Sequence, residues 1–250
     1  MLVSEIMLQQ TQVDRVKSYY KNFLAAFPTL SFLAHASDAA VLKTWSGLGY
    51  NRRALNLKKA AQELAGKPFP QTMEELVKLP GIGPYTAGAV LAFAFNRKVV
   101  FADVNIKRVI MRYFGVKEKD VRTLLEHSLL VQFVQTADAH DLYSALMDLG
   151  ALVCINKPKC VICPLQASCN AYPQILTQPQ KQKKTARFIG SNRWWRGQIL
   201  KTLVAGKKTE QGLYQCITLH GVKNKKQFQL ALLELQEEVI VKRNTTTYEV

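Results

Sequence analysis

Apolar residues up to about residue 172 recur every three or four positions, which is the spacing of one face of an α-helix. No sustained alternation of apolar and polar residues competes with this pattern. Glycine and proline interrupt it at short intervals, for example at Pro28, Gly47, Pro68 and Pro80. The pattern therefore predicts a mainly α structure of many short helices. The clearest helical runs are VKSYYKNFLAAF, ALNLKKAA, TAGAVLAFAF and LYSALMDLGALV.

The pattern changes after residue 172. Residues 173–189 are rich in Pro, Gln and Lys, can bury little surface, and are predicted to form a basic linker. In residues 190–250, RWWRGQILKTLVAG and KNKKQFQLALLELQEE have helical spacing, and EVIVKRNTTTYEV predicts a hairpin around Arg243 and Asn244. Helices followed by a hairpin indicate a small winged-helix-like α+β segment. Such a segment either places a helix in a DNA groove or serves only protein contacts.

Composition narrows the class of partner. The chain has 250 residues, 48% of them apolar, which is enough for a real core in one large domain or two unequal ones. Lys and Arg number 34 against 18 Asp and Glu, and the resulting charge of +16 favours nucleic acid as partner over an acidic membrane surface. No run reaches the ~18 apolar residues of a membrane span. With no secretory signal in MLVSEIMLQQ, we expect a cytoplasmic protein of the bacterial type.

Four of the five cysteines lie within sixteen residues, with the spacing C-x5-C-x2-C-x5-C. Structural disulfides are rare in a reducing cytoplasm, so this group favours a metal centre. Thiolates suit tetrahedral zinc or an iron-sulfur cluster, but paired zinc knuckles usually lie farther apart in the sequence. We expect a 4Fe-4S cluster, with zinc as the less favoured occupant. The predicted ligands are Cys154, Cys160, Cys163 and Cys169.

The remaining cysteine, Cys216, stands in an apolar run, where a buried small hydrophobic residue is the simpler interpretation. Lys157 and Lys159 lie inside the first cysteine loop. A loop fixed by a metal would hold both ammonium groups at the surface, where they could meet DNA phosphates. Two solvated lysines are the alternative.

The segment LPGIGPYTAGAV places Gly81 and Gly83 in a short turn directly before an apolar helical run. Glycine allows a ligand to approach the backbone closely, and Pro84 suits the first position of a helix. With TMEELVKL as a preceding helix, the pattern predicts two helices joined by a tight hairpin. The exposed amides at the helix start would bind a DNA phosphate without sequence information.

Six segments together resemble the helix-hairpin-helix DNA glycosylases of the endonuclease III superfamily, and within it the adenine DNA glycosylases (MutY-type). The resemblance extends from residue 2 to about residue 170. It implies a six-helix barrel with the helix-hairpin-helix in residues 1–101 and a cluster-bearing helical domain in residues 102–172. The active site would lie in the cleft between these domains. The matching segments are SEIMLQQTQV, WSGLGY, LPGIGPYTAGAV, DVNIKRV, MDLGALVC and the cysteine loop.

Removal of a base requires extrusion of the nucleotide and cleavage of a C–N bond through an oxocarbenium-like state, so the site needs an acid and an anion. By the resemblance, Asp103 is the carboxylate that stabilises the sugar cation; it also suits a helix N-cap. Glu5 matches the glutamate that protonates the leaving purine, a role that burial beside apolar neighbours would support by raising its pKa. Asn105 matches an asparagine that assists them.

Gln10 and Tyr50 match residues that wedge into or line the opened duplex. Tyr85 stands where the strand-cleaving members of the superfamily carry a lysine that forms a Schiff base. A phenol cannot replace that amine. The resemblance therefore implies a monofunctional glycosylase in base excision repair, which removes adenine opposite guanine or 8-oxoguanine without efficient strand cleavage. The expected partner is double-stranded DNA with mispaired adenine, bound by a monomer at the nucleoid.

The sequence departs from the family pattern in several places. The first cysteine loop has five residues where the family usually has six, and Asn51 replaces a second tyrosine after GLGY. Family members have a helix before the SEIMLQQ motif, so we expect a truncated chain or a different cover for that surface. Residues 190–250 are also too short for the domain that recognises 8-oxoguanine in longer relatives.

Other functions stay open at this point. The closest rival enzyme removes thymine or uracil from G:T or G:U mispairs, because those relatives also carry tyrosine at the Tyr85 position. LQQTQV after Glu5 favours the adenine branch. A DNA-binding relative without activity is a second alternative, disfavoured because Glu5 and Asp103 would both oppose DNA binding. Strand nicking of the endonuclease III kind is disfavoured by Tyr85.

Overall fold

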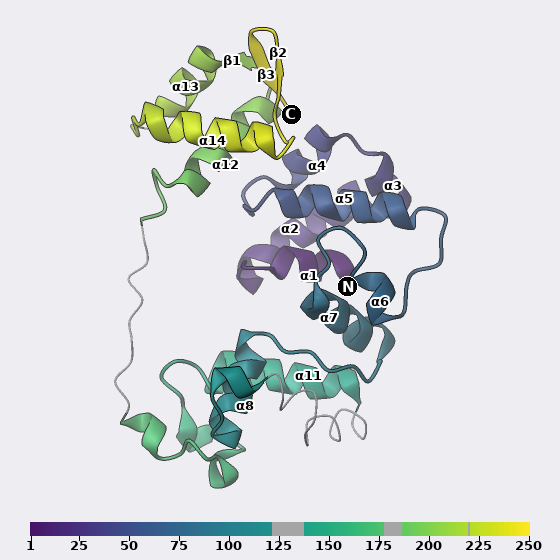
Figure 1. Ribbon diagram of the computed structural model, residues 1–250, viewed down its shortest axis with the longest axis vertical. Coiled ribbons are helices and arrows are strands. Elements are labelled where there is room, and N and C mark those ends of the chain that lie inside the picture. Colours follow the sequence, from purple (N-terminus) through teal and green to yellow (C-terminus); the bar gives the residue numbers. More distant parts are fainter. Residues whose placement is uncertain (122–137, 178–186, 220) are drawn as a thin grey trace. The chain divides into compact units, whose positions relative to one another are not determined.

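The computed structural model describes residues 1–121, 138–177, 187–219 and 221–250 (Figure 1). Within them the chain is mainly helical, with one small sheet. This confirms the predicted fold class, mainly α with a C-terminal α+β segment. No described helix is long and apolar enough to cross a membrane. The chain forms two compact units, each built from separate segments: Met1–Glu5, Pro70–Lys78 and Ile82–Lys183 in one, and Ile6–Phe69, Leu79–Gly81 and Lys184–Val250 in the other.

The helices of the second unit's N-terminal part surround an aromatic core. Phe23 and Trp45 are fully buried, and their rings meet edge to face with centroids 5.8 Å apart. Thr29 and Ser37 each accept a backbone N–H at the start of a helix, a contact that contributes about 1 kcal/mol. α3 and α4 pack on α5, and α2 packs on α4. The helices are α2 (Val13–Ala26), α3 (Leu30–His35), α4 (Asp38–Trp45) and α5 (Arg52–Leu64), preceded by α1 (Leu2–Leu8).

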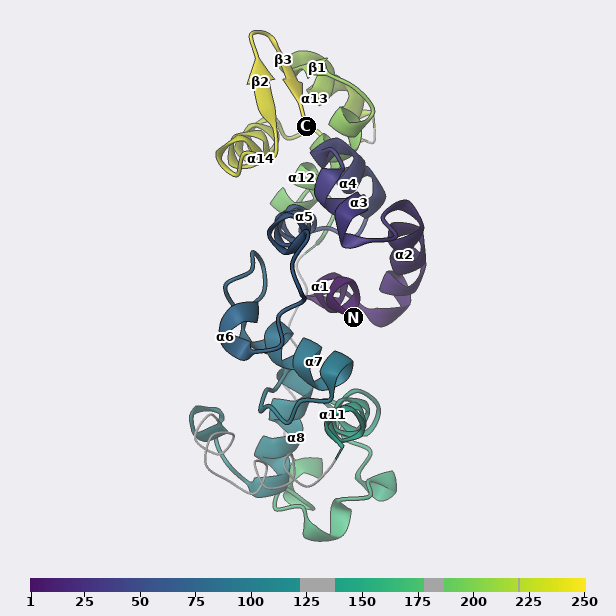
Figure 2. The same ribbon diagram turned by 90° about the vertical axis from the view of Figure 1, so that its right-hand side faces the viewer.

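The C-terminal part of the same unit combines three helices with three short strands. Trp195 and Phe228 are fully buried and form its core. The antiparallel sheet has the order β1-β3-β2, and in both views its strands lie together beside α13 (Figures 1 and 2). The elements are α12 (Asn192–Val204), β1 (Lys208–Thr209), α13 (Glu210–Thr218), α14 (Lys225–Glu237), β2 (Lys242–Asn244) and β3 (Thr247–Glu249).

The predicted hairpin is present, but its turn lies two residues later than the sequence predicts. Arg243 and Asn244 belong to β2 and pair with Tyr248 and Thr247. The turn follows at Thr245, whose φ of 47° supplies the left-handed conformation that a tight hairpin turn needs. Because threonine rarely takes this conformation, the sequence pointed to the Arg-Asn pair instead.

The first unit is centred on α7, α8 and α11. Tyr143 is fully buried; its hydroxyl accepts the N–H of Phe101 at 3.2 Å and donates to the carbonyl of Val99 at 2.8 Å. A π-helical turn and short 3-10 turns then lead through the cysteine loop. The elements are α6 (Met73–Leu76), α7 (Pro84–Phe95), α8 (Val104–Phe114), α11 (Ala139–Asp148), η1 (Leu149–Val153), η2 (Cys160–Ile162), η3 (Gln166–Ser168) and η4 (Gln174–Leu176).

The predicted linker starts within the described residues and then leaves them. Residues 174–176 form η4, residues 178–186 lie outside the description, and α12 begins shortly after residue 187. The domain boundaries expected from the sequence stay a prediction.

Candidate active site

Asp103 caps the N-terminus of α8. Its Oδ1 accepts the backbone N–H groups of Asn105 at 2.9 Å and Ile106 at 2.7 Å, and its Oδ2 accepts the Asn105 side-chain amide at 2.9 Å. Asp103 is therefore the N-cap of α8, as one interpretation of the sequence predicted. The cap does not compete with a chemical role, because the side chain stays half-buried and the cap fixes the direction of the carboxylate.

Asn105 connects this carboxylate to the start of the cysteine loop. Its Oδ1 accepts from Arg108 Nη2 at 2.8 Å, and the same guanidinium donates to the carbonyls of Gly150 at 2.5 Å and Cys154 at 2.7 Å. Asn105 and Arg108 share one face of α8, three residues apart. Gly150 leaves room for this contact, since a Cβ on it would lie 2.7 Å from Asn105 Cβ.

Glu5 lies in α1 and is 8% exposed. Burial raises the pKa of Glu5 above its ordinary value, and the negative charge of Asp103 raises it further, while the N-terminal amine opposes both. Glu5 and Asp103 therefore interact electrostatically within the first unit. A carboxyl group with a raised pKa can hold a proton at a higher pH than an ordinary glutamate.

Tyr85 lies in the first turn of α7 and packs edge to face on Phe101, with ring centroids 5.7 Å apart. Burial strongly raises the pKa of Tyr85, and the charges of Glu5 and Asp103 raise it further. The phenol thus stays neutral beside the two carboxyl groups. The structure brings together three predicted site residues: one buried carboxyl group with a raised pKa, one carboxylate fixed by hydrogen bonds, and one neutral hydroxyl.

The predicted helix-hairpin-helix is formed by α6 and α7. Gly81 has a φ of +78°, and a Cβ on it would lie 2.8 Å from Asn56 Cβ, so both the backbone and its surroundings require glycine. Gly83 is the N-cap of α7, is exposed, and has open space where a Cβ would be. Pro84 is the first residue of α7, as expected. Backbone amides at the start of a helix suit an anion.

Gln10 and Tyr50 are exposed and both take positive φ values, 56° and 49°. Their loops are joined by Arg53, a residue that the sequence did not single out. Its guanidinium donates to the carbonyls of Ile6, Met7 and Gln9 on one side, to the Gly49 carbonyl on the other, and to the Thr11 hydroxyl. It also lies 5.3 Å from the centroid of the Tyr50 ring.

The sequence contains a pattern that could have identified Arg53. This residue falls on the stripe of α5 that otherwise carries Leu57, Ala60 and Leu64, all buried, so a charge there must find partners inside. Burial lowers the pKa of Arg53, and its hydrogen bonds all go to neutral oxygen acceptors of the backbone and of a hydroxyl. Likewise Arg108 and Arg112 continue the stripe of Asn105 along α8 and form a polar line on that face of the helix.

The four predicted ligand cysteines line a single cavity with Arg112. Cys154 accepts from Arg112 Nη1 through its sulfur at 3.4 Å, and Cys169 Sγ lies 3.5 Å from the Arg112 carbonyl. Burial raises the pKa of Cys160, and Cys163, Cys169 and Cys154 each raise it further, so the four thiols lie within electrostatic reach of one another. Among the described residues, none of the four forms a disulfide.

The remaining predicted residues have ordinary surroundings. Lys157 and Lys159 are exposed on the cysteine loop, which is compatible with either phosphate contact or plain solvation. Cys216 is half-buried in α13, less deeply than expected for a core residue.

Comparison with known proteins assigns the family. Residues 3–133 match the family model described as "HhH-GPD superfamily base excision DNA repair protein". The chain is 40% identical over 200 residues to the adenine DNA glycosylase of Buchnera aphidicola subsp. Baizongia pistaciae (strain Bp), covering 77% of this chain and 57% of that protein. It is 35% identical over 258 residues to that of Buchnera aphidicola subsp. Acyrthosiphon pisum (strain APS), covering 95% and 70%.

A solved structure of a thermostable thymine-DNA glycosylase is also similar, with a TM-score of 0.63 and 31% identity over 69% of this chain and 83% of that chain. Because the family model spans more than half of the 250 residues, the chain belongs to the HhH-GPD superfamily of base excision DNA repair proteins. Within that superfamily, its sequence relatives place it in the adenine DNA glycosylase branch. This confirms the predicted family. The chain spans 57% of the length of the first of these relatives.

Proposed function

We propose that the chain hydrolyses the N-glycosidic bond of adenine mispaired with guanine or 8-oxoguanine in double-stranded DNA. The observation that carries this proposal is the pairing of Glu5 and Asp103 in one site. One carboxyl group is buried with a raised pKa, and the other is fixed by three hydrogen bonds. The names of the sequence relatives support adenine as the base removed.

The two carboxyl groups have separate tasks in this reaction. Glu5 donates its proton to a ring nitrogen of the extruded adenine, so the electron pair of the breaking C–N bond leaves with a neutral base. The sugar becomes an oxocarbenium-like cation, which the negative Asp103 stabilises across the short distance between them. Water then adds to the sugar carbon and gives up a proton, which the Glu5 carboxylate left by the first step accepts, so that the acid is restored. The Asn105 amide keeps the Asp103 carboxylate aimed at that position.

Tyr85 limits the chemistry to base removal. Its phenol stays protonated because of burial and the neighbouring carboxyl groups, and it offers no amine for a Schiff base. We therefore propose a monofunctional enzyme. Its hydroxyl remains available as a neutral hydrogen-bond donor to the substrate.

DNA would be held by several elements of the chain. The amides at Gly81 and Gly83 suit a phosphate, and the exposed Gln10 and Tyr50 suit the gap left by an extruded base. Lys157 and Lys159 would add phosphate contacts, and the charge of +16 favours the polyanion as a whole. We further propose that the protein acts as a monomer in the bacterial cytoplasm, at the nucleoid.

The four cysteines would hold a 4Fe-4S cluster. A single tetrahedral zinc ion with Zn–S bonds of ~2.3 Å draws its sulfurs to about 3.8 Å apart. The four cysteines line one cavity, and their close spacing in the sequence favours one compact group over two separate zinc knuckles. Arg112 faces the cysteines and would balance the charge of four thiolates. The cluster would fix the loop, and iron and sulfide analysis of the purified chain, with zinc assayed in parallel, tests the assignment.

The glycosylase proposal is tested by single-turnover release of adenine from a duplex with one central G:A pair, and from one with 8-oxoguanine:A. Duplexes with G:T and G:U pairs serve as controls, because a thymine-DNA glycosylase is 31% identical in sequence. Release of adenine alone, without strand cleavage, is the expected result. Release of thymine or uracil in its place would overturn the substrate assignment, and no release of any base would overturn the activity.

A further inference from the structure

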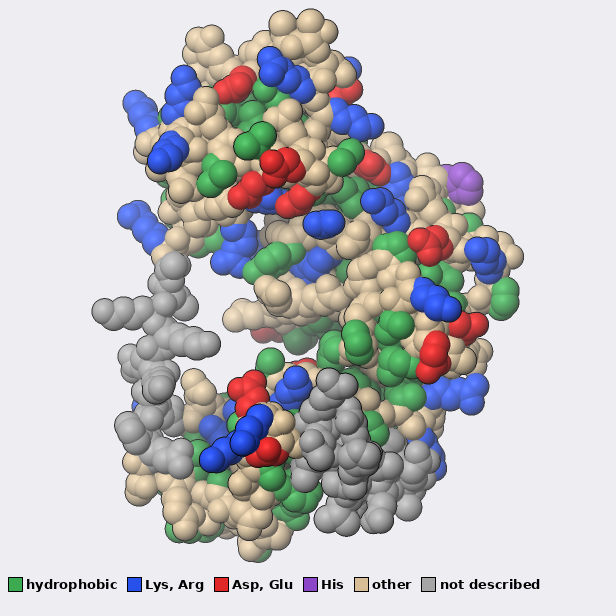
Figure 3. Space-filling model, viewed as in Figure 1, with side chains coloured by type: hydrophobic (Ala, Val, Ile, Leu, Met, Phe, Trp, Pro, Cys, Tyr) green, Lys and Arg blue, Asp and Glu red, His purple; other side chains and the backbone are tan. Residues whose placement is uncertain are grey.

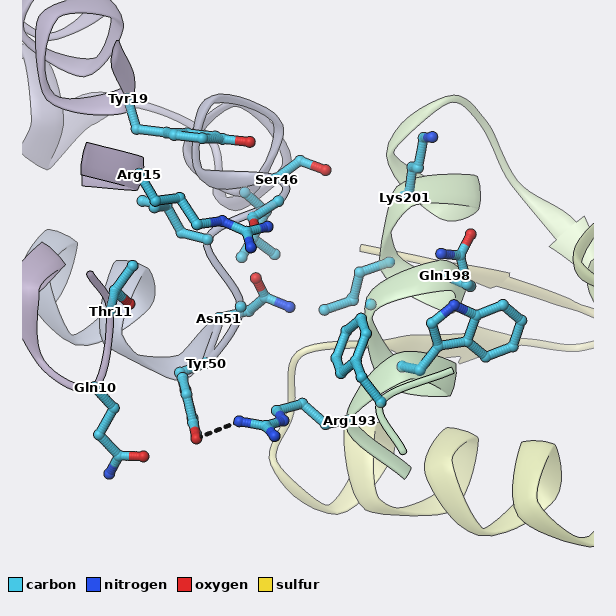
Figure 4. A pocket seen from close by; sticks show the side chains of 18 of the residues that line it. Gln10, Thr11, Arg15, Tyr19, Ser46, Tyr50, Asn51, Arg193, Gln198 and Lys201 are labelled. Carbon is cyan, nitrogen blue, oxygen red and sulfur yellow. Dashed lines mark hydrogen bonds between the residues drawn. The ribbon is translucent and has the colours of Figure 1, made fainter. Parts of the chain in front are cut away.

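A pocket of about 670 Å³ lies inside the second unit, between α12 and the loops that follow α1 and α4 (Figure 4). We call it the α12 pocket. Gln10, Asn51 and Tyr50 line one side, and Arg193, from α12, faces Tyr50 across it. The Arg193 guanidinium donates to the Tyr50 hydroxyl at 2.7 Å. The C-terminal segment thus contributes directly to the surface that carries two of the residues proposed to enter the duplex.

The pocket is positively charged. Arg15, Arg193 and Lys201 line it, and none of the described lining residues is Asp or Glu. None of these three cations forms an ion pair with a described carboxylate within 4.0 Å. Arg15 donates to the Gly47 carbonyl and Arg193 to the Tyr50 hydroxyl, so both are held in place by neutral acceptors and keep further N–H donors for a ligand. Uncompensated, oriented guanidinium groups favour an anionic ligand.

Helix α12 presents this charge on a fixed face. Arg193, Gly197 and Lys201 are spaced four residues apart, which places them on one side of the helix. The other side carries the buried Ile199 and Leu203, together with Arg196. Arg196 forms ion pairs with Glu234 at 3.0 Å and with Glu238 at 2.7 Å on the α14 side. The core and these two pairs keep the cationic face turned toward the pocket.

Gly197 gives a second, independent indication that the α12 pocket binds a ligand. It stands in the middle of a 13-residue helix, where glycine is less favourable than alanine. No atom of the described residues lies within 4 Å of the position that its Cβ would take, so this part of the fold gives no steric reason for glycine. It lines the pocket between the two cations of α12. A ligand whose backbone approaches α12 closely would give such a reason.

Charge alone does not locate this ligand, because Lys and Arg side chains lie in many places on the visible face outside the grey residues (Figure 3). The position of the pocket locates the ligand, because Gln10 and Tyr50, which we propose enter the duplex, line the same pocket. We propose that the α12 pocket binds the phosphodiester backbone of duplex DNA, with Arg193 and Lys201 on the phosphates and the bare backbone of Gly197 beneath them. This inference rests on the proposed function. It makes the C-terminal segment a part of the DNA-binding surface rather than a contact site for proteins.

The experiment compares variants of the whole chain in binding to a fluorescent duplex with a central G:A pair, across a series of salt concentrations. Arg193→Gln combined with Lys201→Gln removes both α12 cations. Lys225→Gln combined with Lys226→Gln removes the same charge from exposed positions of α14 that do not line the pocket. Gly197→Leu fills the pocket without removing charge. Melting temperatures and adenine release by the unaltered chain are measured alongside.

We expect the α12 double variant to weaken binding about tenfold near 0.1 M salt. The slope of its salt dependence should become shallower by about 1 for each phosphate that the variant no longer binds. The α14 double variant should change the slope much less. Gly197→Leu should melt at a higher temperature than the unaltered chain and still bind DNA more weakly.

Two results separate failure of the inference from failure of the proposed function. Equal binding and equal salt dependence for all variants would overturn the inference. Weak binding by the α12 variants in a chain that releases no adenine would overturn the proposed function but uphold the inference.

Discussion

The side-chain amide of Asn105 donates a hydrogen bond of 2.9 Å to Oδ2 of Asp103, while two backbone amides hold Oδ1 of the same carboxylate. All three partners are N–H donors, and together they hold both oxygens of the carboxylate. The arrangement fixes a negative charge at the start of α8 through neutral amide donors alone. Such a charge is well placed to stabilise a cation that forms only during the reaction.

Replacement of Asp103 by Asn separates this role from capping. Asparagine is as good an N-cap as aspartate, so the free energy of unfolding should change by less than about 1 kcal/mol. Adenine release under single-turnover conditions should fall by ~100-fold or more, because the charge that stabilises the sugar cation is gone. Urea denaturation and the release assay measure the two effects. A variant that releases adenine at the original rate would contradict the assignment.

Glu5 predicts how the reaction depends on pH. Because burial raises its pKa, the protonated acid persists above the pH at which an ordinary glutamate ionises, and it is lost as pH rises through the raised value. Adenine release should therefore become slower as pH rises through the raised pKa of Glu5. Glu5→Gln should release adenine slowly at every pH and should not show this decline. If the variant keeps the same pH profile as the original chain, another group is the acid.

The same pKa shift predicts an effect on stability. The folded chain holds the Glu5 proton more tightly than the unfolded chain, so the free energy of unfolding falls as pH rises from the unfolded value of about 4.3 through the raised folded value. Glu5→Gln removes this dependence. The variant should melt higher than the original chain at neutral pH and about equally below pH ~4. A Gln variant that is less stable at neutral pH would show that burial of the charged form has no cost.

The two hairpin glycines should respond differently to alanine. Gly81→Ala meets both an unfavourable φ and the Asn56 side chain at 2.8 Å, and should lower the free energy of unfolding by about 1–3 kcal/mol. Gly83→Ala has open space and should leave stability within about 1 kcal/mol. It should nevertheless weaken binding to duplex DNA, because its methyl group would occupy the place that we propose for a DNA phosphate. Thermal melts and binding curves for the pair distinguish the fold from the ligand as the reason for each glycine.

Arg53 should be critical for stability. Arg53→Lys keeps the charge, but one ammonium group cannot reach acceptors on both sides of the guanidinium plane. We expect a loss of about 2–3 kcal/mol in the free energy of unfolding, because several carbonyls lose their donors. Arg52→Ala, at the exposed neighbouring position, is the matched control and should change stability by less than about 0.5 kcal/mol. Equal urea midpoints for both variants would contradict the role of Arg53.

The helices and the family could be predicted from the sequence because both depend on local patterns. Apolar spacing defines α5 and α7, and the turn at Gly81 is marked by its own residues. The family followed from six short segments in order, and the comparisons confirm it. The neighbourhood of Asp103, Glu5 and Tyr85 in one site was implied only by the resemblance.

The rest depends on contacts between distant segments, which no local pattern encodes. Arg53 hydrogen-bonds backbone atoms 44 to 47 residues away, and Arg193 meets Tyr50 across 143 residues. The hairpin turn lies later in the chain than the sequence predicts, because Thr245 takes a conformation that its side chain disfavours. The α12 pocket was not foreseen, since its charge becomes visible only when α12 packs beside α4.

The tight contact between Gly150 and Asn105 has a consequence for natural variation in this gene. A methyl group at position 150 would push on the asparagine that aims the Asp103 carboxylate, although residue 150 is itself buried in protein. A survey that considers only the side chains proposed for catalysis would overlook such a change, because glycine has no side chain. Under the proposed function, we expect a natural variant at position 150 to impair adenine release in the same way as a change at Asn105 itself.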